Sequence, residues 1–129
     1  MNTFVNPALA PSAKAIADSL MNEIKGVRGV VISTEDGFEL ASCIENTAQV
    51  SRLAAMASSL AALGALAGEE SNLGSCDSLV MQASDGYLAI VQVQRADVSL
   101  ILSIVAGPDA VLGQILYQAK KAASTLKAV

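Results

Sequence analysis

The sixteen residues Leu53–Gly68, LAAMASSLAALGALAG, carry no charge, and they decide how this chain is put together. Read at helical spacing, they give two parallel rows of side chains that lie one residue apart. The large row is Leu53, Met56, Leu60, Leu63 and Ala67, and the small row is Ala54, Ala57, Ala61, Gly64 and Gly68. A surface helix needs only one apolar face, so two apolar rows predict a helix with two packing partners.

The two rows suit different partners. We expect the large row to fill the core of the chain's own domain, and the small row to let a second backbone approach closely, as small residues do at tight helix contacts. Gly64 favours this interpretation, since a glycine inside a helix is about 1 kcal/mol less favourable than alanine and usually has a packing reason. The alternative is an alanine-rich helix that crosses a crowded core. If the small row is the contact, Ala61→Leu or Gly64→Leu should weaken dimerisation, because overpacking typically costs about 1–3 kcal/mol.

Patterns on both sides of this helix predict the remaining elements. Pro11 opens a first helix that stops at Gly26. Two Asp-Gly pairs mark hairpin turns, because glycine tolerates a positive φ. The predicted strands cover residues 29–33, 38–43, 77–83, 87–94 and 98–106, the long helix begins near Ala48, and the last helix follows Gly107-Pro108-Asp109. Residues 1–10 are expected to form a flexible lead, and residues 11–129 a single domain.

The fifth predicted strand sets the fold class. Residues 98–105 are apolar on both faces apart from two serines, so this strand should lie in the middle of a sheet with helices on both sides. Hairpin pairing then leaves strands two and three at the edges. The prediction is an α/β fold, a three-layer α/β/α sandwich with the element order α-β-β-α-β-β-β-α. Its five-stranded mixed antiparallel sheet has the order 2-1-5-4-3.

The two predicted edge strands differ in charge. Strand two carries Glu39 and is followed by Glu45, and such charges discourage edge-to-edge pairing. Strand three has an uncharged centre without proline, which is a template for pairing with another chain. Because strand three follows the helix with the small row, both features predict one dimer face. Its predicted residues are Ala54, Ala57, Ala61, Gly64, Ala65, Ser78, Leu79, Val80, Met81 and Gln82.

Composition argues against several classes of function. The net charge of −4 comes from twelve acidic and eight basic residues scattered along the chain, which argues against nucleic-acid binding. No GxxxxGK[ST] loop and no GxGxxG motif after a strand occurs, and the absence of histidine removes a Ser/His/Asp triad and the commonest metal ligand. Cys43 and Cys76 are isolated, and we expect them to be buried and reduced. We therefore expect no catalytic residue, no metal and no cofactor.

The charged residues are interpreted as structural. The acid pairs Glu35-Asp36 and Glu69-Glu70 are expected to be solvated, and an enzyme would need a carboxylate site that no motif reveals. Three lysines near the end of the last helix complement its dipole. Single arginines are usually surface residues. The residues concerned are Lys120, Lys121, Lys127, Arg28, Arg52 and Arg95.

The 53% hydrophobic content raises the question of a membrane span. A spanning helix needs about 20 apolar residues, whereas the uncharged run has sixteen and contains Ser58 and Ser59. The Ala-Leu-Ala-Pro stretch near the N-terminus is similar to a cleavage site, but neither the basic nor the apolar region of a signal peptide precedes it. We expect no membrane insertion and a cytoplasmic location.

Taken in order, residues 11–127 resemble the roadblock / dynein light-chain domain family. The resemblance runs through the first helix, Gly-Val-Arg-Gly-Val-Val-Ile-Ser, Asp36-Gly37 and the long helix up to Gly64. It continues through Asp85-Gly86-Tyr87-Leu88 and through Leu112-Gly113, which opens the last helix. The resemblance implies an α/β/α fold with the sheet order 2-1-5-4-3, and dimers made by the second helix and the third strand.

The resemblance also implies a function. Members are non-catalytic platforms, and bacterial members similar to MglB bind Ras-like small GTPases of the MglA type and regulate nucleotide turnover. The expected partners are a second copy of the chain and such a GTPase. The extended charged C-terminal tail of some bacterial regulators has no counterpart in this sequence, which ends soon after the last helix. The alternative is a purely structural scaffold or adaptor that has no effect on GTP turnover.

Overall fold

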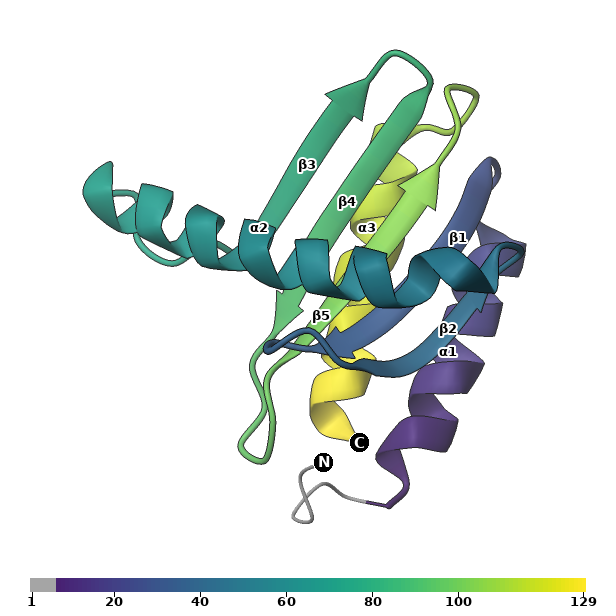
Figure 1. The fold of residues 1–129 in the computed structure, drawn as a ribbon, viewed down its shortest axis with the longest axis horizontal. Coiled ribbons are helices and arrows are strands. Elements are labelled where there is room, and N and C mark those ends of the chain that lie inside the picture. Colours follow the sequence, from purple (N-terminus) through teal and green to yellow (C-terminus); the bar gives the residue numbers. More distant parts are fainter. Residues whose placement is uncertain (1–6) are drawn as a thin grey trace.

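The structure is a computed structural model that describes residues 7–129. Within these residues, three α-helices and five strands follow each other in the predicted order (Figure 1). They are α1 (Leu9–Glu23), β1 (Val27–Thr34), β2 (Glu39–Ile44), α2 (Val50–Glu70), β3 (Ser78–Ala83), β4 (Gly86–Val93), β5 (Leu100–Ala106) and α3 (Leu112–Ala128). A short 3₁₀ turn, Thr47–Gln49, precedes α2, and the side chain of Asn46 caps it.

The strand order is β2-β1-β5-β4-β3, as predicted. Every neighbouring pair is antiparallel, so the sheet is not mixed. β5 lies in the centre, and six of its seven residues are buried, which agrees with its apolar sequence. Both Asp-Gly pairs form turns with a positive φ at the glycine, +96° at Gly37 and +149° at Gly86.

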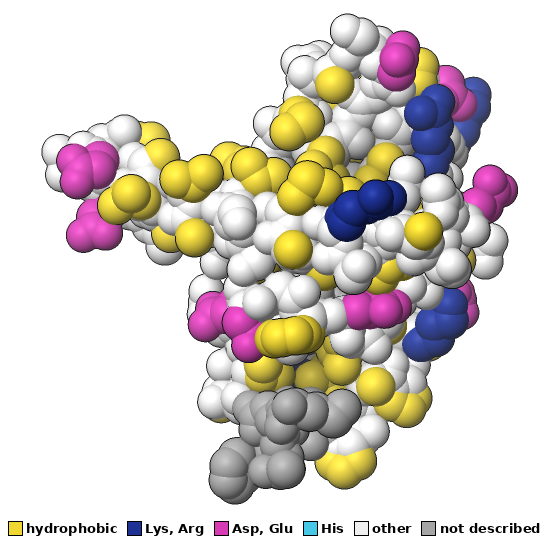
Figure 2. Space-filling model, viewed as in Figure 1, with side chains coloured by type: hydrophobic (Ala, Val, Ile, Leu, Met, Phe, Trp, Pro, Cys, Tyr) yellow, Lys and Arg dark blue, Asp and Glu magenta, His cyan; other side chains and the backbone are white. Residues whose placement is uncertain are grey.

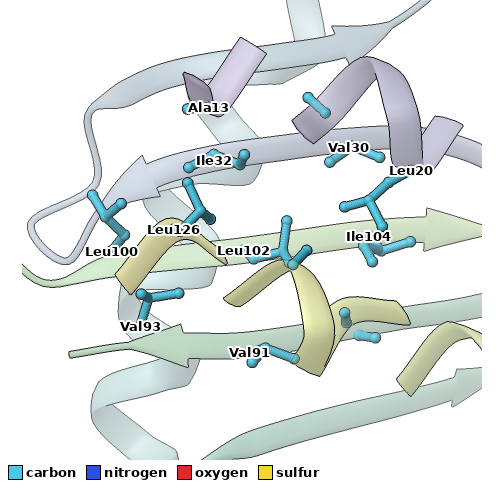
Figure 3. Close-up of a cluster of buried hydrophobic side chains, with 14 of the residues drawn as sticks. Ala13, Leu20, Val30, Ile32, Val91, Val93, Leu100, Leu102, Ile104 and Leu126 are labelled. Carbon is cyan, nitrogen blue, oxygen red and sulfur yellow. The ribbon is translucent and has the colours of Figure 1, made fainter. Parts of the chain in front are cut away.

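The three layers are also confirmed. α1 and α3 pack on one face of the sheet, and α2 crosses the other face (Figure 1). The main core lies on the α1/α3 side, where Leu20, Leu102 and Leu126 come together from three different elements (Figure 3). Two smaller apolar clusters lie beneath α2. The α2 side of the sheet is therefore the less covered side.

α1 begins two residues earlier than the sequence predicts. Leu9 is the first helical residue and is fully buried in the main core, so its burial stabilises a helix start ahead of Pro11. Pro11 then falls in the first turn, where it needs no backbone N–H. Leu9 and Ala10 thus belong to the fold and not to a lead. Residues 1–6 of the expected lead lie outside the described residues.

Candidate interaction surface

The small row of α2 faces the chain's own sheet, which is the opposite of what was predicted. Ala54, Ala57, Ala61 and Gly64 are all buried, and the two middle alanines pack against Ile90 of β4 and Ile101 of β5. The prediction that this row makes the dimer contact is wrong for these four residues. Of the other predicted contact residues, Ala65 and Val80 to Gln82 are exposed, and Ser78 and Leu79 are half-buried.

The size of the sheet's side chains explains this orientation. Isoleucines on β4 and β5 fill the space beneath α2, so the helix must present small residues to lie close to the sheet. Gly64 also leaves little room for a side chain, because a Cβ there would lie 3.0 Å from the Cys76 Sγ atom. Periodicity in the sequence identified two rows correctly, but the bulk of distant strands decides which row turns inward.

The large row is left on an exposed flank of α2. The exposed fraction is 52% for Met56, 61% for Leu63 and 55% for Leu66, while Leu53 and Leu60 are half-buried at the base of the flank. Figure 2 shows hydrophobic side chains in a continuous line along one edge of this helix. Exposed apolar surface of this extent marks an interaction site in a soluble protein. We call Met56, Leu60, Leu63 and Leu66 the α2 flank.

A second apolar strip lies on the sheet beside this flank. The β3–β4 register pairs Met81 with Leu88, and the β4–β5 register pairs Leu88 with Val105, so the three side chains share one face. Leu60 and Leu88 pack against the same buried cluster, which places the strip next to the α2 flank. Met81 is 49% exposed, and on the α2 face no helix of the described chain covers this part of the sheet (Figure 1). The α2 flank and this strip together form one apolar surface.

The two sheet edges differ in how they are covered. In the described part of the chain β3 pairs only with β4, and its residues Val80 to Gln82 are exposed and uncharged. At the other edge, Lys14 of α1 donates a 2.7 Å hydrogen bond to the carbonyl oxygen of Ser42 on β2. The Ser42 hydroxyl donates to Glu39 at 2.7 Å. The β2 edge is thus blocked by charged groups, whereas the β3 edge is open for another strand.

Titratable groups at the β2 edge are shifted in pKa. Lys14 and Asp18 lie 2.9 Å apart, and their hydrogen bond raises the pKa of Lys14 and lowers that of Asp18. Burial raises the pKa of the nearby Cys43 thiol, which is free and only half-buried. A thiol with a raised pKa is a poor nucleophile. These shifts belong to a structural contact between α1 and β2.

α2 is long enough to span a membrane by length and composition, so the argument against a spanning helix from length was wrong. Within Thr47–Glu70, the most apolar stretch of 18 residues has a mean hydropathy of 1.5 and few charges, and 28% of that stretch is buried. One face of this helix packs on the sheet, as described above. The α2 flank is the apolar part of this helix that the sheet leaves exposed.

Among residues 7–129, no group of three or more acidic or cysteine side chains is placed to hold a metal ion. Glu35, Asp36, Glu69 and Glu70 are all exposed, as predicted for solvated charges. Two hollows of about 250 and 350 Å³ lie along α3, and the lining of the larger includes Lys120, Lys127 and residues at the end of β4.

Arg95 was wrongly predicted to be a surface residue. Its side chain is 5% exposed and forms a bidentate ion pair with Asp97, with Nε–Oδ1 at 2.8 Å and Nη2–Oδ2 at 2.9 Å. It also donates to the carbonyl oxygens of Leu126 and Val129 at the end of α3. Only the Arg-x-Asp spacing was visible in the sequence, because the carbonyl partners lie more than thirty residues away.

Comparison with protein families finds a match to the Roadblock/LC7 domain over residues 14–105. Comparison with curated proteins finds no match. Among solved structures, MglB of Myxococcus xanthus has a TM-score of 0.83 at 14% identity, over 96% of this chain and 91% of that one. A Roadblock/LC7 domain of Streptomyces avermitilis has a TM-score of 0.81 at 18% identity, over 89% and 94%.

A structure described as MglB with a tetrameric arrangement has a TM-score of 0.82 at 20% identity, over 96% of this chain and 91% of that one. At such identities the likeness shows the fold.

Proposed function

This chain belongs to the Roadblock/LC7 domain family, and we propose that it acts as a homodimeric, non-catalytic platform that binds and regulates a Ras-like small GTPase. The family match and the MglB-like neighbours support a role in GTPase regulation or as an adaptor. The tetrameric arrangement of one MglB structure supports self-association. We propose that the platform works in the cytoplasm.

One observation supports the dimer most: the open edge of β3 lies next to the exposed α2 flank and the apolar strip on the sheet. Unpaired backbone groups on β3 can be satisfied by another β3, and antiparallel pairing of two identical strands requires a two-fold axis beside the edge. α2 crosses the sheet and its C-terminal part reaches past β3 (Figure 1). That projecting part would therefore lie over the neighbouring copy.

The two-fold relation also accounts for the apolar strip on the sheet. Rotation about an axis beside β3 brings the projecting part of the second α2 across the strip that contains Met81, Leu88 and Val105. The two α2 flanks then face each other. Burying their apolar surface stabilises the dimer by about 25 cal/mol per Å². A lipid bilayer would cover the α2 flank but would leave the polar backbone of the β3 edge unsatisfied. A second copy fits both features.

The GTPase part of the proposal rests on the family. The resemblance to MglB-like members implies a partner of the MglA type. The platform would then act by shifting a bound GTPase between nucleotide states. The structural adaptor differs from this only in leaving GTP turnover unchanged.

Light scattering of the purified chain, followed by a GTP-turnover assay, tests the proposal. The measured mass should be twice the 13.1 kDa of the single chain. Met81→Lys should give the monomer, because the dimer would bury a charge in the apolar strip on the sheet. The dimer should also change the turnover rate of an MglA-type GTPase from the source genome. A dimer that changes no such rate but binds the GTPase would support the adaptor, and a monomer would contradict the platform.

A further inference from the structure

β4 continues past the start of β3 and has an open edge of its own there (Figure 1). The β3–β4 ladder begins with Ser78 opposite Val91. One further hydrogen bond, 3.1 Å long, runs from the Gln92 amide to the carbonyl oxygen of Asp77. Successive residues of a strand turn their backbone groups to opposite sides, so Gln94 is the next residue that faces this edge. Its N–H and C=O have no backbone hydrogen-bond partner within residues 7–129.

The larger hollow along α3 lies at this open edge. It has a volume of about 350 Å³, and its lining includes Val93 and Gln94 from the edge and Lys120, Ser124 and Lys127 from α3. The three α3 residues step by four and three, so they lie on one side of the helix. All three are exposed. The open strand edge is thus bordered by two lysines that stand about two helical turns, or roughly 10 Å, apart.

The charges around the hollow leave it positive. Lys120 and Lys127 take part in neither of the two ion pairs found in the part of the chain that the structure describes. Asp77 is the one acidic residue of the lining. Two unpaired lysines at one site stand out in a chain whose net charge is −4. Carboxylates that enter the hollow would form charge-assisted hydrogen bonds with both ammonium groups.

We propose that this hollow binds an extended acidic segment of a partner protein, which adds to β4 as a strand in line with β3. The backbone of the segment would satisfy the open N–H and C=O of Gln94, as peptides do when they extend a sheet. Side chains two residues apart in a strand lie on one face, about 7 Å from each other. Two carboxylates at that spacing can reach Lys120 and Lys127. The α2 flank takes no part, so the inference does not rest on the proposed function.

Fluorescence anisotropy of a short labelled peptide of alternating glutamate and valine tests the charges. Lys120→Glu combined with Lys127→Glu should weaken binding at least about tenfold, because two attractive contacts become repulsive. Lys25→Glu combined with Arg52→Glu is the matched control. It changes the net charge by the same amount at exposed sites outside the hollow, so it should leave the dissociation constant nearly unchanged.

Strand pairing is tested separately from charge by N-methylated peptides. Val93 points into the core on the α3 side, so Gln94 and the peptide residue opposite it turn their side chains to the α2 side. The glutamates, which must reach α3, therefore alternate with the residues whose amides face β4. N-methylation of every valine should abolish binding. N-methylation of every glutamate removes as many amides and should leave most of the affinity.

A gain in affinity gives a result that misfolding cannot imitate. Asp77→Asn should tighten peptide binding about two- to fivefold, because it removes the acid of the lining. The Gln94 amide should also exchange more slowly when the peptide is bound.

The inference is contradicted if charge reversal at the hollow acts no more strongly than the control reversal. Equal binding of the two methylated peptides would mean attraction by charge alone and would contradict the strand. A chain that dimerises but does not bind the peptide would contradict this inference and leave the proposed function standing.

Discussion

Arg95 ties the β4–β5 turn to the end of α3 through one nearly buried guanidinium group. It pairs with Asp97 on one side and donates to the last carbonyl oxygens of α3 on the other. These carbonyls have no partner within the helix. A single side chain therefore satisfies the end of one element and fixes the turn between two others.

Arg95→Ala should lower the free energy of unfolding by about 2–3 kcal/mol, because it removes the ion pair with the partly buried Asp97 carboxylate and the donor to the helix-end carbonyls. Urea denaturation monitored by circular dichroism measures this. Lys120→Ala, at an exposed site on the same helix, is the control and should stay within about 0.5 kcal/mol of the wild type. Equal stability of the two variants would show that the Arg95 contacts contribute little.

Ala57 and Leu63 separate the fold from the interface. Ala57→Leu should lower the free energy of unfolding by about 1–3 kcal/mol, because its site beneath α2 has no room for a larger side chain. Leu63→Ser should leave the fold of the single chain unchanged and weaken dimerisation. Ala61→Leu and Gly64→Leu should likewise lower the free energy of unfolding, and any loss of dimer would follow from that. Urea denaturation at low protein concentration and sedimentation distinguish the two effects, and a stable Ala57→Leu variant that is monomeric would reverse the assignment.

At the scale of elements, the strand order and layers followed from features that the sequence displays openly. The apolar β5 and the two Asp-Gly turns restrict the sheet to few arrangements. The orientation of α2 did not follow, because its two rows are adjacent and both apolar. Which row is buried depends on Ile90 and Ile101, which come much later in the chain. The helix itself was therefore predictable, but the choice of its buried face was not.

The unequal edges should limit assembly to discrete oligomers. Lys14→Ala combined with Glu39→Ala removes both charged groups that block the β2 edge, so this variant should form larger species through edge-to-edge pairing. Sedimentation velocity would detect them as a concentration-dependent fast fraction. Lys121→Ala combined with Glu23→Ala, on α3 and α1, removes the same charges away from any edge and should not. Identical sedimentation of both double variants would mean that these charges do not guard the β2 edge.

At the scale of the whole molecule, dimerisation and folding should be coupled. The thermal midpoint should rise with protein concentration, because a second copy that binds only the folded chain stabilises it by mass action. Leu63→Ser should remove most of this dependence. Differential scanning fluorimetry with an extrinsic dye measures both. A thermal midpoint that is the same in dilute and concentrated solution would indicate that the chain does not dimerise over that range of protein concentration.

The central claim is that the β3 edge and the α2 flank meet a second copy, and amide hydrogen exchange of dilute and concentrated protein tests it most directly. Within Ser78 to Gln82, the alternate amides that point away from β4 should exchange more slowly as concentration rises, because a second β3 takes up the free edge, while amides of β2 keep their rates. Exchange along β3 that is fast and independent of concentration, in a solution where the chain is oligomeric, would place the contact elsewhere and contradict the account.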